Sequence, residues 1–284
     1  MSRISYQLLR TTSRISIPNK AQVRKYTTIE TVLNSTIAVN QLLLQNIQSM
    51  THLPWWLTIS VSTILLRTTI TLPIAIYQQK QYQKYRQLKP LLVSWGNTLK
   101  KEYQTAKVNE IGYLFNMQRF IKSEYKTKIQ SIYKQYNYSP ASIYLLPIIQ
   151  IPFFVVMSLS LRAICGYPIF DLDLDNFHLQ EFSIGGYSWF SNLIAPDPTN
   201  ILPILIGATH LLNIEVNQLF LKAVVNKNEK YINYVLRGMA LVMIPVAIVS
   251  PSALSVYWLT SANFSLVQNL LFRNTKVRQL LKIN

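Results

Sequence analysis

One arginine stands in the middle of an apolar segment that otherwise has the composition of a membrane span. Arg67 lies within residues 55–77, which are rich in Leu, Ile, Val, Thr and Trp. A guanidinium at bilayer depth costs about 2.5–3.5 kcal/mol on insertion scales, and it does not lose its proton. At ~1.5 Å rise per residue, mid-span lies roughly 15 Å from either helix end, beyond comfortable reach of the headgroups. The sequence therefore predicts a polar, water-filled groove beside Arg67; the alternative is a displaced helix that leaves Arg67 near an interface.

The other residues with reactive side chains form no recognisable catalytic or metal-binding set. His52, His178 and His210 are isolated, and no His-Glu-x-x-His, Gly-x-Ser-x-Gly or phosphate-binding loop occurs in the sequence. The single cysteine, Cys165, excludes an internal disulfide and is expected to be a packed small residue. We therefore expect neither an enzyme nor a bound cofactor, metal or small-molecule substrate. A solute transporter is disfavoured too, since the chain shows no duplicated halves or paired broken helices.

The elements that would position Arg67 follow from composition and hydropathy. Half of the 284 residues are hydrophobic and only 14% are charged, yet the net charge is +17. This combination suits a membrane protein with basic loops better than a soluble enzyme. Five apolar stretches approach the ~20 residues that a transmembrane helix needs: 55–77, 143–163, 201–221, 232–249 and 253–272. The predicted fold is an all-α polytopic membrane protein with five transmembrane helices.

The charges of the loops predict how these helices are oriented. Residues 78–142 carry twelve Lys and Arg, whereas residues 163–200 carry none and hold five acidic residues. The connection at 222–230 is basic again, 250–252 is neutral, and 273–284 is a short basic tail. Positive loops stay on the side from which helices insert. The first loop and the C-terminus are therefore predicted on one side, and the acidic loop 164–198 with the N-terminus on the other.

The N-terminal segment indicates which membrane this is. Residues 1–26 contain six Lys and Arg with scattered Ser and Thr, no acid precedes Glu30, and no secretory apolar core is present. This composition predicts a mitochondrial transit peptide; the alternative is a basic amphipathic arm that stays attached. The protein is then expected to be multi-pass in the mitochondrial inner membrane, with its C-terminus in the matrix. Residues 27–54 would form a segment in the intermembrane space.

The long basic loop, 78–140, has its own apolar periodicity. Leu88, Leu92, Trp95 and Leu99 recur every three to four residues, and a similar series follows a turn at Asn109–Gly112. This spacing predicts two amphipathic helices forming an antiparallel hairpin that projects into the matrix. A basic, aromatic surface of this kind could contact ribosomal RNA, lipid headgroups or a client chain. The alternative is a solvated charged face over a small packed seam.

Four segments in this order resemble the Oxa/YidC/Alb family of membrane protein insertases. They are Leu65–Arg67 with Leu72-Pro73, Leu146–Pro152, Trp189–Pro203, and Pro251–Asn263 followed by Gln268. The resemblance covers roughly residues 50–275 and implies five core helices (within 55–272) around a hydrophilic groove that opens to the matrix and to lipid. It also implies that the matrix hairpin is mobile and contacts clients. Beyond Arg67, it assigns to the groove Gln150, Tyr257, Trp258, Asn263 and Gln268; the alternative for each is helix–helix hydrogen bonding.

The C-terminal tail, 273–284, lacks the long basic helix by which the better-known mitochondrial member holds ribosomes. The chain thus resembles the short-tailed mitochondrial branch, which is associated with cytochrome c oxidase assembly and with export of the C-terminal domain of oxidase subunit II. The implied partners are hydrophobic client membrane proteins, inner-membrane lipids and assembly factors, with weak or absent ribosome contact. A general co-translational insertase and a non-translocating assembly scaffold remain the alternatives.

Overall fold

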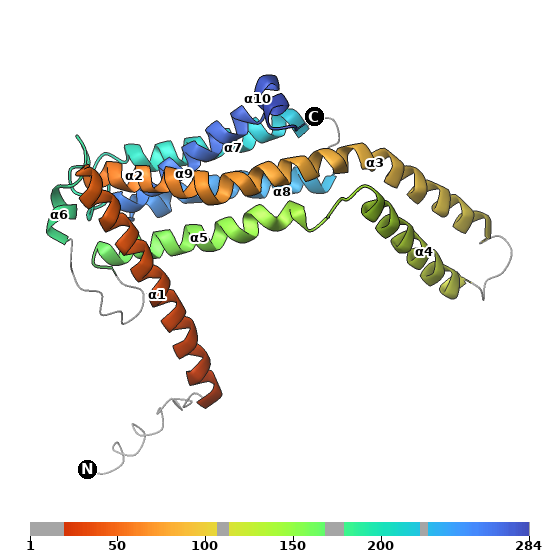
Figure 1. The fold of residues 1–284 in the computed structure, drawn as a ribbon, viewed down its shortest axis with the longest axis horizontal. Helices are drawn as coiled ribbons and strands as arrows, with labels where there is room; N and C mark the ends of the chain where they lie inside the picture. The colour runs from red at the N-terminus through yellow and green to blue at the C-terminus, as the bar shows by residue number, and fades with distance from the viewer. Residues whose placement is uncertain (1–19, 107–113, 168–178, 222–226, 284) are drawn as a thin grey trace, which may run out of the picture.

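The computed structural model describes residues 20–106, 114–167, 179–221 and 227–283, and throughout these ranges the regular structure is helical (Figure 1). The only β-type pairing within them is an isolated bridge between Tyr187 and Phe190. The elements are α1 (Lys20–Thr51), α2 (Trp55–Leu66), the π-helical turn η1 (Arg67–Thr71), α3 (Leu72–Ala106), α4 (Leu114–Gln135), α5 (Ser142–Ile164), α6 (Leu179–Ile184), α7 (Ile201–Leu221), α8 (Lys227–Ile248), α9 (Ser252–Leu271) and α10 (Thr275–Leu280).

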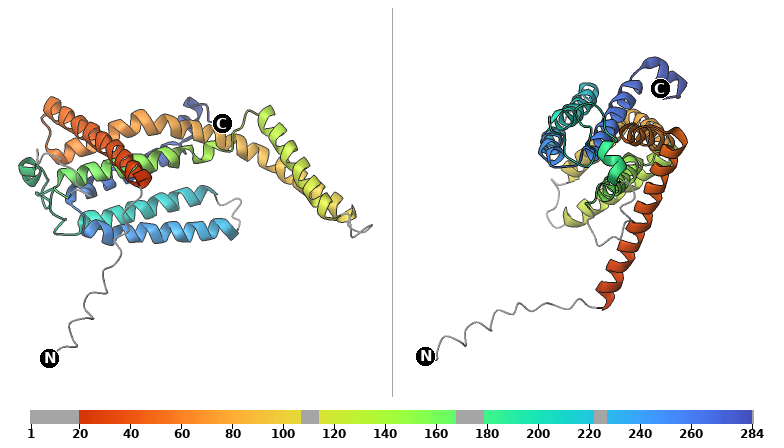
Figure 2. Two further views of the ribbon diagram at one scale, coloured as in Figure 1. Left: turned by 90° about the horizontal axis from the view of Figure 1, so that it is seen from below. Right: turned by 90° about the vertical axis from the view of Figure 1, so that its left-hand side faces the viewer.

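Helix α9 is the central element of the bundle. It packs against α2, α5 and α7, while α8 packs against the outside of α7 (Figures 1 and 2). Every residue from Ser252 to Trp258 is buried, so the first two turns of α9 have no exposed face. Small hydroxyl residues such as Thr58, Ser62 and Thr63 are buried beside it on α2. Their hydroxyls donate to carbonyls one turn back, which lets polar residues sit inside a tightly packed helical bundle.

The first apolar segment and the first hairpin helix form one continuous helical rod. It runs from Trp55 through η1 to Ala106, without a break at the predicted end of the span near residue 77. No glycine or proline follows Tyr77 until Pro90, so the sequence there contains no helix-ending signal. Within the described residues, Trp55–Glu102 and Tyr144–Ile164 are long and apolar enough to cross a membrane, and Asn233–Ile248 is a shorter apolar helix.

The outer faces of two helices are apolar and exposed. On α5, Tyr144, Ile148 and Ile151 are 62–66% exposed, and on α8 Met239 and Val242 are 59–62% exposed. Exposed apolar surface of this extent marks contact with lipid or with another protein. It supports membrane placement, while the arrangement of five spans stays a prediction.

Beyond the bundle, α3 and α4 pack against each other as a helical pair (Figure 1). Their seam is formed by Leu88 and Leu92 from α3 with Ile132 from α4 and Tyr138 just after it. Lys128 lies over the ring of Trp95, with its ammonium nitrogen 4.7 Å from the ring centroid. The predicted turn at Asn109–Gly112 lies outside the described residues.

Helix α1 is an element to which the sequence assigned no structure. It begins at Lys20, inside the predicted transit peptide, and continues through most of residues 27–54. Figure 2 shows it crossing the bundle obliquely, where it packs on α5. Ile37, Asn40 and Leu44 are buried in this contact, and the Asn40 side-chain amide donates to Ser160 Oγ at 3.0 Å.

The end of the bundle at α6 is closed by a continuous apolar cluster. Trp55 from α2, Phe182 from α6, Leu193 and Leu254 from α9 belong to it, and each is at most 4% exposed. Trp55 Nε1 also donates to Glu181 Oε2 at 2.9 Å. We call the whole cluster the apolar plug. Its buried members are Leu44, Trp55, Ile59, Met157, Leu161, Cys165, Phe182, Phe190, Leu193, Leu202, Ile206, Ala247, Ala253, Leu254, Val256, Tyr257 and Trp258.

Asp197 fixes the start of α7 beside the plug. Its Oδ1 accepts from Thr199 N at 3.0 Å, and its Oδ2 accepts from Leu202 N at 2.8 Å. We expect Asp197→Ala to cost about 1–2 kcal/mol of folding free energy through loss of this helix cap. Asp197→Asn, which keeps an acceptor oxygen, should lose less. Thermal unfolding of the detergent-solubilised protein measures the difference; equal midpoints for wild type and Asp197→Ala would contradict the cap.

Candidate functional site: a polar cavity around Arg67

Arg67 is a buried cation held by hydroxyl groups. Its side chain is 5% exposed, and its guanidinium donates to Ser265 Oγ at 2.8 Å and to Ser261 Oγ, both from α9. The guanidinium carbon also lies 5.8 Å from the ring centroid of Phe264. Within the described residues Arg67 makes no ion pair; Arg237 with Glu215 does. Hydroxyl oxygens and a ring face stabilise the cation without neutralising its charge.

The helix changes its winding at Arg67. Residues Arg67–Thr71 form a π-helical turn, and the Thr71 hydroxyl donates to the Arg67 carbonyl at 2.9 Å. The hydroxyls of Thr68 and Thr69 likewise donate to carbonyls four residues back. A π-turn inserts one extra residue per turn, which redirects the side chains around it, and such turns are frequent at functional sites. Here it directs Arg67 toward α9.

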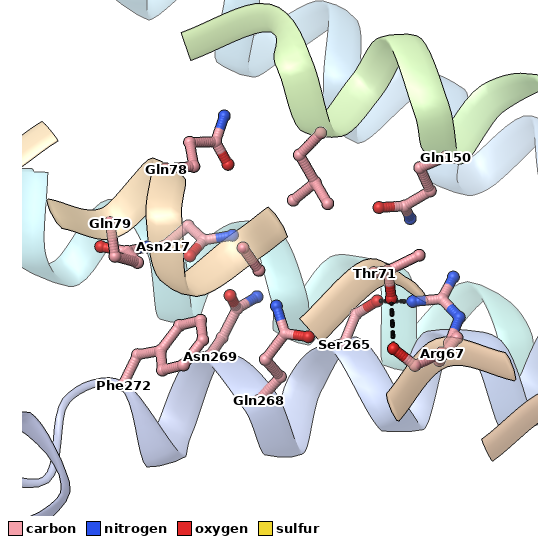
Figure 3. Close-up of a pocket in the computed structure, with 12 residues that line it drawn as sticks. Arg67, Thr71, Gln78, Gln79, Gln150, Asn217, Ser265, Gln268, Asn269 and Phe272 are labelled. Atoms are coloured by element: carbon pink, nitrogen blue, oxygen red, sulfur yellow. Dashed lines mark hydrogen bonds between the residues drawn. The ribbon is translucent and has the colours of Figure 1, made fainter. Parts of the chain in front are cut away.

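Beside Arg67 lies a polar cavity of about 300 Å³, and Figure 3 shows the side chains that line it. At about 30 Å³ of liquid volume per water molecule, it holds several waters. Its lining comes from η1, α3, α5, α7 and α9, and from Phe272, which follows α9. The lining residues are Arg67, Thr71, Ala75, Gln78, Gln79, Leu146, Gln150, Asn217, Ser265, Gln268, Asn269 and Phe272. No described lining residue is acidic. The cavity is therefore polar and carries one positive charge.

The structure brings three of the six predicted site residues together. Arg67, Gln150 and Gln268 line this one cavity from three different elements. Tyr257 and Trp258 lie instead within the apolar cluster, at 1% and 6% exposure, and Trp258 Nε1 donates to Ser158 Oγ at 3.0 Å.

The side chain of Asn263 contacts α7 and not the cavity. Its side-chain oxygen accepts from Thr209 Oγ1 of α7 at 3.4 Å, and it does not line the cavity. The sequence reasoning missed Ser261 and Ser265, which bind Arg67. Their spacing with Gln268 (i, i+4, i+7) places all three on one helix face, so helical periodicity could have identified them. Asn217 of α7 carries no such signal, since only tertiary packing brings it to the cavity.

The cavity and the apolar plug occupy opposite ends of the same helices. On α9 the residues of the plug lie between Ala253 and Trp258, and the residues that line the cavity lie between Ser265 and Asn269. On α5 the plug includes Met157 and Leu161, together with Cys165 just after the helix, whereas Leu146 and Gln150 line the cavity. The bundle thus contains a polar cavity toward the hairpin and is packed mainly with apolar side chains toward α6, with buried hydroxyls such as those of Thr58 and Ser255 among them.

Removing both hydroxyls that hold Arg67 should destabilise the bundle. A buried donor that loses its acceptor costs about 1–3 kcal/mol, and more when it is charged. We therefore expect the Ser261→Ala/Ser265→Ala double variant to lose at least this much stability by thermal unfolding in detergent. Ser255→Ala is the control, since Ser255 is buried on α9 as Ser261 is, and its hydroxyl oxygen has no hydrogen-bond partner among the described residues. Equal losses in both variants would show that the hydroxyls do not hold Arg67.

Comparison with known proteins agrees with this architecture. Residues 46–279 match the family described as 60Kd inner membrane protein. The chain is 35% identical over 260 residues to the human mitochondrial cytochrome c oxidase assembly protein COX18, covering 88% of this chain and 74% of that protein. It is 31% identical to the corresponding protein of Schizosaccharomyces pombe, covering 78% of this chain and 94% of that protein.

A more distant similarity links the chain to a second mitochondrial group. It is 28% identical to the mitochondrial inner membrane protein OXA1 of Arabidopsis thaliana, covering 87% of this chain and 52% of that protein. The resemblance noted from four sequence segments, including that to the mitochondrial oxidase-assembly branch, is thereby confirmed. The chain belongs to the 60Kd inner membrane protein family, the Oxa/YidC/Alb family of membrane protein insertases.

Proposed function

We propose that this protein is a mitochondrial inner-membrane insertase for cytochrome c oxidase assembly, and that it exports hydrophilic segments from the matrix to the intermembrane space. The C-terminal domain of oxidase subunit II is the proposed client segment, in keeping with relatives named for oxidase assembly. One observation carries the proposal: the buried Arg67 makes no ion pair within the described residues and borders a polar cavity, midway along the apolar segment 55–77.

The proposed topology has five membrane helices around a groove, of which the cavity is the described part. The N-terminus and the acidic loop would face the intermembrane space, and the α3–α4 hairpin and the C-terminus would face the matrix. Residues 1–26 would be removed as a transit peptide. The alternating loop charges and the exposed apolar faces of α5 and α8 support this placement. The cavity then opens toward the matrix, and the apolar plug lies on the intermembrane-space side.

The proposed mechanism needs no covalent chemistry. A polar segment that crosses hydrocarbon loses its water at a cost of several kcal/mol for each unpaired group. A water-holding cavity within the helices shortens that dry path. Arg67 offers a client carboxylate or carbonyl a charged donor, in exchange for Ser261 and Ser265. The apolar part of the client then moves sideways into lipid.

The energy must come from the client and the membrane. Partitioning of a client helix into lipid is favourable, and the membrane potential contributes about 2.3 kcal/mol per charge per 100 mV. This potential favours moving acidic segments out of a negative matrix. The basic hairpin is the proposed first contact for clients, with lipids and assembly factors as further partners.

Site-specific photocrosslinking in energised mitochondria tests the proposal. Probes replace Thr71 and Gln268, which line the cavity, and Val155, which is 44% exposed on the outer face of α5, serves as the control. During translation we expect the two cavity probes to capture client chains and the control to capture none. Capture of subunit II alone supports the narrow role, whereas capture of many nascent chains supports a general insertase. If neither cavity probe captures a client, the proposal fails and a scaffold that admits no client becomes the better explanation.

A further inference from the structure

A second cavity, of about 460 Å³, adjoins the first at the end of the bundle where the hairpin begins. The two share Gln78 and Gln79 of α3, Asn217 of α7, Asn269 of α9 and Phe272. The second cavity adds Tyr82, Gln83 and three arginines, and none of its described lining residues is acidic. We call it the arginine pocket, after Arg86, Arg273 and Arg278.

The three arginines come from separate parts of the chain. Arg86 lies on α3, Arg273 follows α9, and Arg278 lies on α10. Arg273 Nη2 donates to Asn217 Oδ1 at 3.3 Å, and Arg278 Nε donates to the Ile283 carbonyl at 3.3 Å. Burial lowers the pKa of Arg273 from its ordinary value. The chain thus folds back after α9 and brings three arginines to the lining of one cavity.

The depth and the charge of the pocket select the kind of anion. Residues 78–86 and 273–278 directly follow the predicted matrix ends of the first and fifth spans, which places the pocket at headgroup level. Basic pockets between membrane helices on the matrix side suit phospholipid headgroups such as cardiolipin. Arginine binds phosphate oxygens in a planar, two-pronged geometry. Tyr82 and Phe272 also line the pocket and give it an aromatic surface beside the arginines. The glycerol backbone of a lipid can contact this surface, whereas a free phosphate ion would not.

We propose that the arginine pocket binds the phosphate headgroup of an anionic phospholipid, and that a two-phosphate headgroup of the cardiolipin type fits it better than a headgroup with one phosphate. A two-phosphate headgroup brings two negative charges to a pocket lined by three arginines, whereas a zwitterionic lipid brings no net charge. The inference uses the membrane placement proposed above but does not depend on client insertion.

Lipid titration of the purified full-length protein, followed by native mass spectrometry, tests the pocket. The probes are cardiolipin, phosphatidylglycerol and phosphatidylcholine. The variant Arg86→Gln/Arg278→Gln should bind cardiolipin at least about tenfold more weakly than wild type, since each arginine supplies a charge-assisted hydrogen bond. The control Lys100→Gln/Lys101→Gln removes the same charge from exposed positions of α3 and should bind like wild type. Phosphatidylcholine should bind weakly to all three proteins.

Each other outcome overturns the inference. Equal cardiolipin binding by both double variants would show that the pocket is not the lipid site. Displacement of cardiolipin by inorganic phosphate at equal concentration would identify a free-phosphate site instead. Displacement by an acidic peptide at equal concentration would assign the pocket to clients. Crosslinking from Thr71 and Gln268 is scored separately, so failure here is distinguishable from failure of the proposed insertase function.

Discussion

Export of a client with an acidic exported segment should fall by roughly 10–100-fold when Arg67 is replaced by alanine, since a hydrogen bond to a charged group is worth about 1.5–3 kcal/mol. The variant keeps the polar cavity but removes its positive charge, so a client carboxylate entering the groove loses its charged partner. Protease protection of the C-terminal domain of subunit II in isolated, energised mitochondria measures export. Steady-state abundance of the variant must be measured alongside, because Arg67 also binds two residues of α9.

Two further variants separate charge from geometry. Arg67→Lys keeps the charge but loses the planar fork that reaches Ser261 and Ser265 together, so export should be intermediate. Arg237→Gln removes an arginine whose partner is Glu215 on the bundle surface, 2.7 Å away, and should leave export unchanged. Normal export by a stably inserted Arg67→Ala protein would refute the groove contact and favour a passive scaffold.

Gly186→Ala should prevent the protein from accumulating. A methyl group at Gly186 would overlap the carbonyl oxygen of Phe190 and approach the carbonyl carbon of Ser191 to 2.6 Å. These are backbone atoms of a tight turn, in which Gly186 N donates to Ser191 O at 3.0 Å, so they cannot move aside as a side chain would. Overpacking of this kind costs about 3 kcal/mol or more. Because the turn supports the apolar plug, we expect loss of folded protein by size-exclusion profile and by abundance in mitochondria.

Gly238→Ala is the matched control for that change. Gly238 lies on α8 with nothing within 4 Å of the position that its methyl group would take. Alanine is the better helix former by about 1 kcal/mol at most, so this variant should be neutral or slightly more stable. A Gly186→Ala protein that accumulated and unfolded like Gly238→Ala would mean that the turn is not packed as described.

The sequence predicted the site best where one residue breaks a strong pattern. Few environments can stabilise a single permanent cation within an apolar segment, and Arg67 does border a polar cavity. Helical structure was also predictable: the segments 201–221 and 253–272 correspond closely to α7 and α9. By contrast, α1 carries no comparable signal, because residues 27–54 mix Ser, Thr and Asn with apolar residues. Its buried Asn40 donates to Met157 Sδ and Ser160 Oγ of α5, both more than a hundred residues away in sequence.

The faces of α9 could not be assigned from its sequence for a different reason. Amphipathic periodicity identifies a buried face only when another face is exposed. From Ser252 to Trp258 every residue is buried, so Tyr257 and Trp258 carry no directional signal and lie among apolar neighbours. Farther along, where α9 borders the cavity, the polar residues Ser261, Ser265 and Gln268 do share a face. The π-helical turn at Arg67 could not be predicted from the sequence pattern, since a single widened turn does not alter composition.

The apolar plug has an electrical consequence. Side chains such as Trp55, Ile59 and Phe182 are at most 4% exposed and pack the bundle between the described cavity and α6. An apolar layer of this kind has a low dielectric constant, so protons and small ions that entered the cavity would meet an electrostatic barrier there. In the proposed insertase, this layer would let a polar client segment enter partway across the membrane while opposing the leakage of ions.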